Sequence, residues 1–293
     1  MSIFPKILVG LDLTDMDQSL LDYLDFFKAG SPPPTVHYLH VSYAMQLPTM
    51  VGGRYTREMP DPGLNDQLKA ELLAELQNRI GEEEAVVSVI EGTISRQMLD
   101  YMERKQLNLA IVGKKKVSLG SGVAAKRLLR GTHASVLFVT EDPPKTLDHI
   151  MVAVDFTPYS EHGMRKALAL AKAQPTPPRI TMVNVYDVPT DQAFRISRTE
   201  GQYARIIREN VESIVPEYLA RFDTDGLELG VRLQENTHYN AAKHLYELAG
   251  EVSPSLVVMG ARGHSTLTAL LLGSVTERFL SYNTRFPTLI VRE

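Results

Sequence analysis

The strongest constraint on the fold is that the chain repeats itself. Residues 6–15, KILVGLDLTD, match residues 149–158, HIMVAVDFTP, at a constant offset of 143 positions. Four further strand-like segments recur in the same order: 36–42 with 180–186, 86–93 with 230–237, 107–113 with 255–260, and 135–139 with 287–291. Five short apolar segments that recur in one order indicate a tandem duplication of a strand-rich unit.

The duplication predicts two domains. The chain has 293 residues, which is enough for two domains of ordinary size with sizeable cores. Between the repeats, residues 141–148, EDPPKTLD, interrupt the apolar pattern with paired prolines and charges. We therefore expect a first domain over residues 1–143 and a second over residues 147–293.

Helical patterns separate the strand-like segments. They cover 17–30, 64–81 and 94–106 in the first half, and 160–173, 199–222 and 238–250 in the second. Such alternation predicts an α/β protein with two tandem open parallel five-stranded sheets and helices on both faces. The fifth strands, 136–139 and 288–291, are apolar sheet edges, and we expect them to meet between the halves.

A glycine-rich stretch in the second half points to an anion site. Residues 259–279, MGARGHSTLTALLLGSVTERF, run from the end of a predicted strand (255–260) into a predicted helix (274–282). Glycines let the backbone approach a ligand closely, and N–H groups at a helix start point toward negative charge. Glycines at strand ends also serve ordinary turns, so the spacing alone leaves both readings open.

Asp155 ends the first strand of the same half, so it should lie at the same sheet edge as the glycine loop. In an open parallel sheet, ligands bind beyond the carboxyl ends of the strands where the strand order reverses. Asp155 could instead cap the following helix, although Ser160 is better placed for that role.

A strand that ends in aspartate, followed by a later strand that ends in G-x2-G-x9-G-S/T, resembles the universal stress protein family. Gly260, Gly263, Gly273 and Ser274 satisfy the spacing. The resemblance covers essentially the whole chain as two tandem copies. It implies a flavodoxin-like or Rossmann-like sheet with strand order 3-2-1-4-5, and it implies ATP binding, since the branch with this motif binds ATP.

Carried over by residue, the resemblance places Asp155 near the adenine and ribose and the backbone of Val185 at the adenine edge. The helix start would hold the phosphates of ATP, ADP or AMP, with or without Mg²⁺. Arg262 and His264 fall inside the loop, where they could add charge or simply be solvated. The resulting nucleotide-binding set is Asp155, Val185, Gly260, Arg262, Gly263, His264, Gly273, Ser274 and Val275.

The first half departs from the motif. Lys116 replaces the second glycine, and the stretch from Gly113 to Val139 is five residues shorter than its counterpart. The lysines at 114–116 could neutralise a phosphate or form a solvated face. We therefore predict the better site in the second half, with a degenerate second site formed by Asp12, Val41, Gly113, Gly120, Ser121 and Gly122.

Composition and missing motifs exclude other functions. The chain contains no cysteine, which rules out disulfides and thiol chemistry, and its net charge of -4 argues against nucleic acid as a partner. No G-x4-G-K-[ST], H-E-x-x-H or G-x-S-x-G motif occurs, and we identify no catalytic or metal-ligating residue. The N-terminus lacks the features of a signal peptide, and no apolar run is long enough for a membrane span, so we expect a cytoplasmic protein.

Three functions fit this pattern. The leading hypothesis is an adenine-nucleotide-binding regulatory protein that responds to stress or energy state. The alternatives are a slow ATPase, with His264 as the obvious candidate base, and a nucleotide-free scaffold for protein partners that the sequence does not identify. Single-copy members of the family commonly dimerise, so we expect the two halves to form an intrachain pseudo-dimer, and a homodimer of the whole chain is a further candidate.

Overall fold

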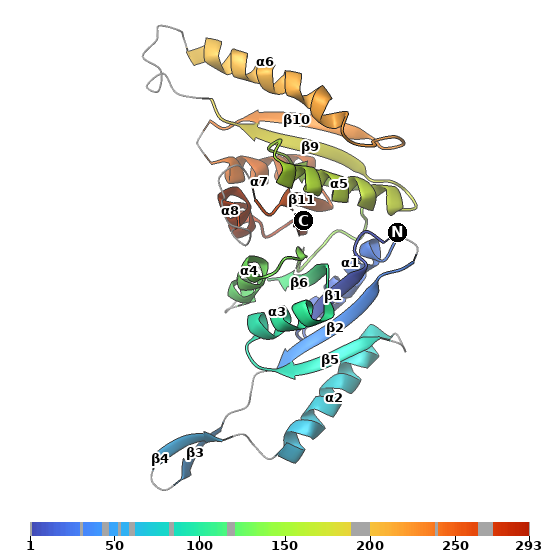
Figure 1. Ribbon diagram of the computed structural model, residues 1–293, viewed down its shortest axis with the longest axis vertical. Helices are drawn as coiled ribbons and strands as arrows, with labels where there is room; N and C mark the ends of the chain where they lie inside the picture. The colour runs from blue at the N-terminus through green and yellow to red at the C-terminus, as the bar shows by residue number, and fades with distance from the viewer. Residues whose placement is uncertain are drawn as a thin grey trace.

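The computed structural model describes residues 2–29, 32–42, 47–51, 54–58, 62–81, 85–115, 121–188, 200–237, 240–262 and 272–292. The first half contains β1 (Lys6–Leu11), α1 (Met16–Leu24), η1 (Asp25–Phe27), β2 (Thr35–Ser42), β3 (Leu47–Val51), β4 (Arg54–Glu58), α2 (Pro62–Ile80), β5 (Val86–Glu91), α3 (Ile94–Lys105), β6 (Leu109–Lys114), α4 (Ser121–Gly131) and β7 (Ser135–Thr140). The second contains β8 (His149–Ala153), α5 (Pro158–Ala173), β9 (Arg179–Tyr186), α6 (Glu200–Leu219), β10 (Leu229–Glu235), α7 (Ala241–Val252), β11 (Leu256–Gly260), α8 (Ser274–Tyr282) and β12 (Thr288–Val291) (Figure 1).

Ten of the strands form one sheet, in the order β10-β9-β8-β11-β12-β7-β6-β1-β2-β5. Within each half the order is the predicted 3-2-1-4-5, and neighbouring strands run parallel. The two predicted five-stranded sheets are joined through β12 and β7, which pair antiparallel with Leu289 opposite Leu137. This pairing confirms that the fifth strands meet, and it removes two unpaired sheet edges.

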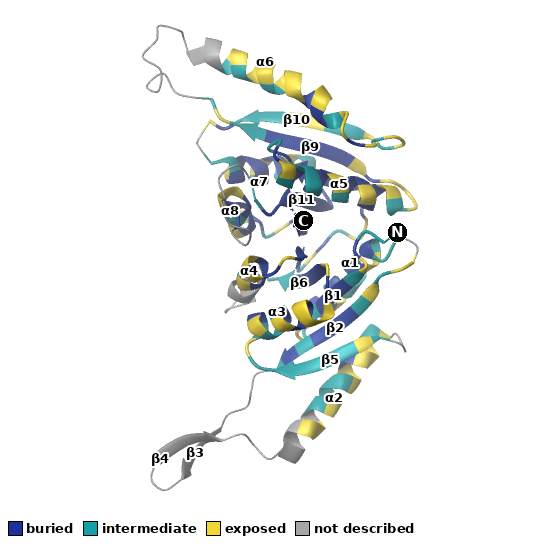
Figure 2. Ribbon diagram, in the orientation of Figure 1, coloured by how far each residue is buried: buried dark blue, intermediate teal, exposed yellow. Residues whose placement is uncertain are grey.

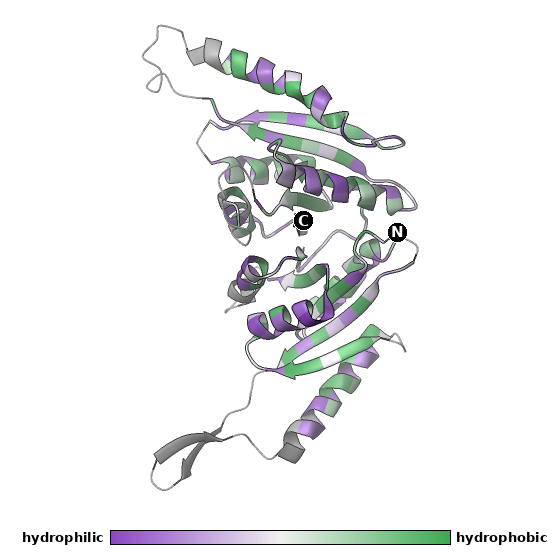
Figure 3. Cartoon of the chain, in the orientation of Figure 1, coloured by the Kyte–Doolittle hydropathy of each residue, from purple (hydrophilic) through white to green (hydrophobic). Residues whose placement is uncertain are grey.

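The helices cover both faces of this sheet. One core cluster contains residues of α1, α2, α5 and α6, and the other contains residues of α3, α4, α7 and α8. Hydrophobic and hydrophilic residues are mixed along helices such as α3 and α5, as expected for helices with one buried side (Figure 3). The strands near the middle of the molecule are largely buried (Figure 2). Among the described residues, no helix has both the length and the hydrophobicity needed to cross a bilayer.

Side chains add further contacts between the halves. The hydroxyl of Tyr23, on α1, donates to the carbonyl of Ser255 at 2.5 Å. Lys114, at the end of β6, donates to the carbonyls of Leu280 and Asn283 at the end of α8. Burial, with a smaller contribution from the charge of Lys126, lowers the pKa of Lys114 to about 8. The halves therefore pack as one continuous unit around the β7–β12 pair.

Two local features differ from the sequence predictions. The helix expected over 17–30 ends at Leu24 and continues as the short 3₁₀ helix η1. The antiparallel hairpin of β3 and β4 has no counterpart among the predicted elements. By contrast, the helix expected over 274–282 is α8 with the same bounds.

Candidate functional site

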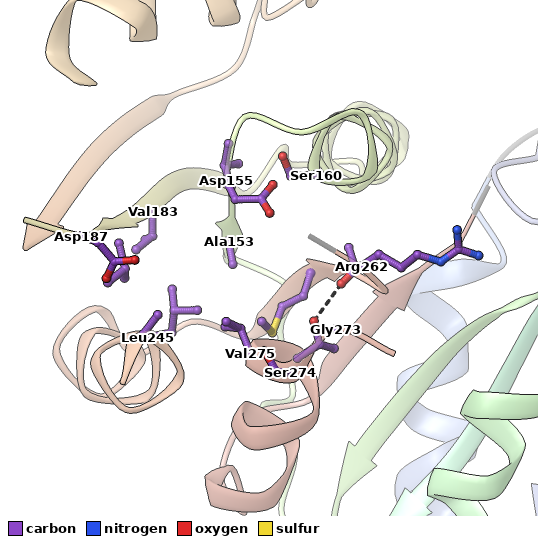
Figure 4. A pocket seen from close by; sticks show the side chains of 16 residues that line it. Ala153, Asp155, Ser160, Val183, Asp187, Leu245, Arg262, Gly273, Ser274 and Val275 are labelled. Carbon is purple, nitrogen blue, oxygen red and sulfur yellow. Dashed lines mark hydrogen bonds between the residues drawn. The ribbon is translucent and has the colours of Figure 1, made fainter. Parts of the chain in front are cut away.

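A cavity lies beyond the carboxyl ends of β8, β9 and β11, next to the start of α8 (Figure 4). Its volume is about 330 Å³, within the range typical of small-molecule sites. β8 lies between β9 and β11 in the sheet, so the cavity sits where the strand order reverses. It brings together seven predicted residues: Asp155, Val185, Gly260, Arg262, Gly273, Ser274 and Val275. Gly263 and His264 lie outside the described residues.

Asp155 is held on a tight turn between β8 and α5. Its Oδ1 accepts hydrogen bonds from the backbone N–H of Thr157 at 3.1 Å and from the Thr157 hydroxyl at 2.5 Å. Phe156, between them, has a φ of 60°, in the left-handed region that a bulky residue seldom occupies. This strained turn fixes the Asp155 carboxylate at the wall of the cavity (Figure 4).

The N-cap of α5 is Thr157, so the expectation that Ser160 would cap this helix is wrong. The Thr157 side chain accepts from the backbone N–H of Ser160 at 3.4 Å. Pro158 is the first residue of the helix, a position where the missing N–H of proline leaves no hydrogen bond unmade. The cap is therefore the residue just before Pro158. Ser160 lies in the first turn, is buried, and lines the cavity.

The backbone of Val185 faces the cavity side of β9. The carbonyl of Val183 accepts from Val154 at 2.8 Å on the β8 side, whereas the carbonyl of Tyr186 accepts from Asn236 on the β10 side. Backbone polar groups alternate along a strand, so those of Val185 point toward the β8 side. The regular pairing of β8 with β9 ends at Ala153, and Val185 lies beyond that point.

The start of α8 forms the opposite wall. Gly273 precedes the helix, and its N–H donates to the carbonyl of Ala261 at 2.8 Å, so this N–H already has an acceptor within the protein. The first helical residues, Ser274, Val275 and Thr276, carry N–H groups that helical geometry leaves without an intrahelical acceptor. The Thr276 hydroxyl donates to the carbonyl of Gly260 at 2.9 Å and ties the helix to β11.

Gly260 is explained by packing as well as by the cavity. A Cβ atom at this position would lie 2.9 Å from the backbone carbonyl oxygen of Tyr159 in α5, a contact that neither backbone can relieve easily. The glycine therefore lets β11 and α5 approach closely. At Gly273, a Cβ atom would lie 3.4 Å from the Cα atom of Arg262, so larger side chains would crowd the helix start.

Charge is distributed unevenly around the cavity. Asp155 and Asp187 place carboxylates near β8 and β9, whereas the helix start offers N–H groups on the other side (Figure 4). Asp187 accepts from the side chain of Asn236 at 2.6 Å. Arg262 extends away from Asp155, with Nη1 donating to the Tyr159 hydroxyl at 3.2 Å and the guanidinium 5.1 Å from that ring's centre.

Sequence reasoning missed several residues that line the cavity: Ala153, Val154, Ser160, Val183, Asp187, Ala241, Leu245, Met259 and Thr276. Asp187 had a usable signal, since it follows the second strand much as Asp155 follows the first. Leu245 and Ala241 had none, because helix α7 reaches the cavity only through the tertiary fold. Among the described residues, no three histidine or acidic side chains gather as metal ligands would.

The matching region of the first half has a different arrangement. Asp12 accepts from the backbone N–H of Thr14 at 3.2 Å and from its hydroxyl at 2.5 Å, as Asp155 does from Thr157. Its second oxygen accepts from the Lys115 ammonium at 2.8 Å. Burial alone would raise the pKa of Asp12, but hydrogen bonds from Lys115 and Thr14 outweigh it and lower that pKa below its ordinary value. Lys115 thus occupies one face of this carboxylate.

The remaining residues of the predicted second site are dispersed over several elements. Val41 lies in β2 and Gly113 in β6. Ser121 and Gly122 begin helix α4, and Gly120 lies outside the described residues. A Cβ atom at Gly113 would meet the Met16 side chain at 2.8 Å.

Comparison with known proteins identifies the architecture. A model of the universal stress protein family matches residues 4–140 and again 146–292. The crystal structure of a universal stress protein from Archaeoglobus fulgidus is 18% identical, with a TM-score of 0.65, covering 100% of this chain and 99% of that one. A functionally unknown protein from Pseudomonas aeruginosa is 17% identical, with a TM-score of 0.58 and coverage of 99% and 92%.

A curated relative, an uncharacterized protein of Schizosaccharomyces pombe, is 37% identical over 86 residues. That match spans 29% of this chain and only 14% of the relative's own length.

Proposed function

The chain belongs to the universal stress protein family, in two tandem copies, and from this premise we propose that its second half binds an adenine nucleotide in a stress-response regulatory role. The observation that carries the proposal is the cavity that gathers Asp155, Val185 and the start of α8 at one sheet edge. ATP, ADP and AMP are the candidate ligands, and Mg²⁺ would enter with the phosphates.

The chemistry of the cavity favours one orientation. The phosphates would lie at the start of α8, where the N–H groups of Ser274, Val275 and Thr276 and the helix dipole attract negative charge. The two carboxylates near β8 and β9 would repel phosphates there but can accept hydrogen bonds from ribose hydroxyls. The backbone of Val185 would then meet the adenine edge.

Two variants test this orientation against adenosine, AMP and ATP by isothermal titration calorimetry. Asp155→Ala should weaken all three ligands by similar factors, about tenfold or more, because it removes a charged acceptor for the part they share. Gly273→Val should weaken ATP more than adenosine, because the added side chain crowds the phosphate end. Asp12→Ala, the matched change in the first half, should alter none of the three affinities by more than about twofold.

A different pattern would contradict the proposal. If Asp155→Ala spared adenosine but abolished ATP binding, the nucleotide would lie in the reverse orientation. If the wild-type protein bound none of the three ligands, and no nucleotide were released when freshly purified protein is denatured, the scaffold alternative would hold. Hydrolysis is not part of the proposal, since its candidate base, His264, lies outside the described residues.

A further inference from the structure

Helix α8 begins at the wall where we place the nucleotide phosphates, and its other end is held by the first half of the chain. The Lys114 ammonium, at the end of β6, donates to the carbonyls of Leu280 and Asn283. The last carbonyls of a helix have no intrahelical donor, and a cation there also interacts favourably with the helix dipole. Over its described length, Ser274–Tyr282, α8 has no basic residue in its own last turn. The cation at its end therefore comes from the other half.

A second cation of the first half contacts the same helix. Arg130, at the end of α4, forms an ion pair with Glu277, in the first turn of α8 (Figure 1). Glu277 brings a negative charge to the helix end where we place the phosphates, and Arg130 partly offsets that charge. Both side chains are exposed, so this ion pair should contribute less than the Lys114 contact.

The end of α8 is a fixed part of the boundary between the halves. Asn283 is 0% exposed, and its side chain donates to the carbonyl of Phe286 at 2.6 Å and to the Thr288 hydroxyl at 2.8 Å. Its Oδ1 accepts from the backbone N–H of Phe286 at 2.9 Å. Thr288 begins β12, the strand that pairs with β7 of the first half. Lys114 therefore contacts a helix end that is already anchored in the joined sheet.

The lysine is not required by the repeated fold. By the repeat, Lys114 corresponds to Ala261, which is buried and has no side-chain donor. The strand order is nevertheless the same in both halves. The contact runs from the half that departs from the glycine motif to the half that satisfies it. This direction is what a support for the second-half site requires.

We propose that Lys114 and Arg130 are positioning residues, through which the first half fixes α8 and sets the affinity of the second half for nucleotide phosphates. This inference rests on the proposed nucleotide function and adds a means of regulating it. Helix α8 has nine residues, so a rise of about 1.5 Å per residue puts its two ends about 13 Å apart. That distance exceeds the Debye length of about 8 Å at physiological salt. Lys114 therefore acts through the position of the helix more than through direct attraction to a phosphate.

Lys114→Met is the main test, because methionine keeps an apolar stem and removes the ammonium. In isothermal titration calorimetry it should weaken ATP about fivefold and adenosine less than about twofold, since only ATP reaches the start of α8. The loss should persist in about 0.5 M salt, which screens direct attraction. Arg130→Gln should weaken ATP about threefold, because it leaves Glu277 without its cation near the phosphates.

Lys166→Met is the matched control. The Lys166 ammonium, on α5, also donates to a carbonyl of the other half, that of Ile3 at 2.9 Å, so the variant loses the same kind of contact away from α8. It should leave the affinities for ATP and adenosine unchanged.

Amide NMR signals of the ligand-free protein give a readout that needs no nucleotide. Lys114→Met should shift the signals of Ser274, Val275 and Thr276, at the far end of α8, and Lys166→Met should leave them in place. Thermal unfolding of each variant checks the fold. If Lys114→Met does not fold, the exposed Arg130 carries the test, and an Arg130→Gln variant with unchanged ATP affinity overturns the inference.

The inference is also overturned if folded Lys114→Met binds ATP as the wild type does, or if ATP and adenosine weaken equally, which would indicate a general loss of structure. An equal loss in Lys166→Met, a loss that disappears in salt, or unmoved amide signals would each overturn it as well. If the wild type binds ATP and these variants show no selective loss, this inference fails and the nucleotide proposal stands. A wild type that binds no nucleotide overturns both.

Discussion

The two halves of the chain hold an aspartate on the same turn, yet a different cation follows each fourth strand. Asp12 and Asp155 each accept from the backbone and hydroxyl of a threonine two residues on. The intervening residues, Leu13 and Phe156, share a left-handed φ of 62° and 60°. A strained backbone conformation has thus been kept in both copies, while the side chains around it have changed.

The different contacts of the Lys115 and Arg262 side chains have an identifiable physical cause. Arg262 stacks on Tyr159 and donates to its hydroxyl, an arrangement that suits a planar guanidinium. The counterpart of Tyr159 is Met16, which offers neither a ring face nor a hydroxyl. Lys115 instead reaches Asp12 and the Thr14 hydroxyl. The differences at these two positions of the repeat therefore direct the cation toward the aspartate in the first half and away from it in the second.

The largest effect expected from this difference is in nucleotide affinity. Calorimetry of the wild-type protein with ATP should show one site per chain, at least about a hundredfold tighter than any second site. A nucleotide in the first half would have to displace Lys115 from Asp12 and would lack the second loop glycine. One displaced ion pair and one obstructed backbone approach, at about tenfold each, together account for about that factor. Two equal ATP sites would show that the halves are functionally equivalent.

A smaller effect is expected on stability when the matched glycines are replaced. Gly260→Ala should lower the free energy of unfolding by about 1–3 kcal/mol, because its Cβ atom meets the backbone carbonyl of Tyr159. Gly113→Ala should cost less than about 1 kcal/mol, because its Cβ atom meets a methionine side chain that can change rotamer. Urea denaturation of both variants measures the difference. Equal losses would mean that the α5 backbone moves as readily as the Met16 side chain.

Much of the fold could be predicted because it repeats. The ordered recurrence of five strands gave the parallel α/β architecture, and the apolar fifth strands predicted the pairing of β7 with β12. The carboxyl ends of the strands then placed Asp155, Val185 and Gly260 in one cavity. The predicted strand order and the meeting of the fifth strands are confirmed, because both follow from local patterns and general topology. The ligand-binding roles of the three site residues stay predictions.

Other features depend on distances that sequence spacing cannot supply. That Lys115 reaches Asp12, 103 residues away, depends on the length of β6 and the rotamer of the lysine. The family resemblance suggested that Gly260 is a glycine because a ligand comes close, whereas the carbonyl of Tyr159 already requires it. The engaged N–H of Gly273 and the cap at Thr157 likewise follow from geometry at single residues.

The smallest effect concerns the ion pair that distinguishes the first half. The pKa of Asp12 is lowered below its ordinary value of 3.8 in the folded state. The stability that this carboxylate contributes is therefore fully present above pH 3.8 and is lost as the pH falls through the folded-state pKa. Both partners are partly exposed, so the coupling between Asp12 and Lys115 should be only about 0.2–1 kcal/mol at pH 7. A double-mutant cycle with Asp12→Asn and Lys115→Met, measured by urea denaturation, isolates that coupling from each residue's other contacts. The coupling should shrink as the pH falls below 3.8 and through the folded pKa of Asp12, because protonation removes the negative charge. It should also weaken with added salt, because counter-ions screen the ion pair. A coupling that changes neither with falling pH nor with added salt would mean that Lys115 is held by its bond to the Thr14 hydroxyl rather than by the charge of Asp12.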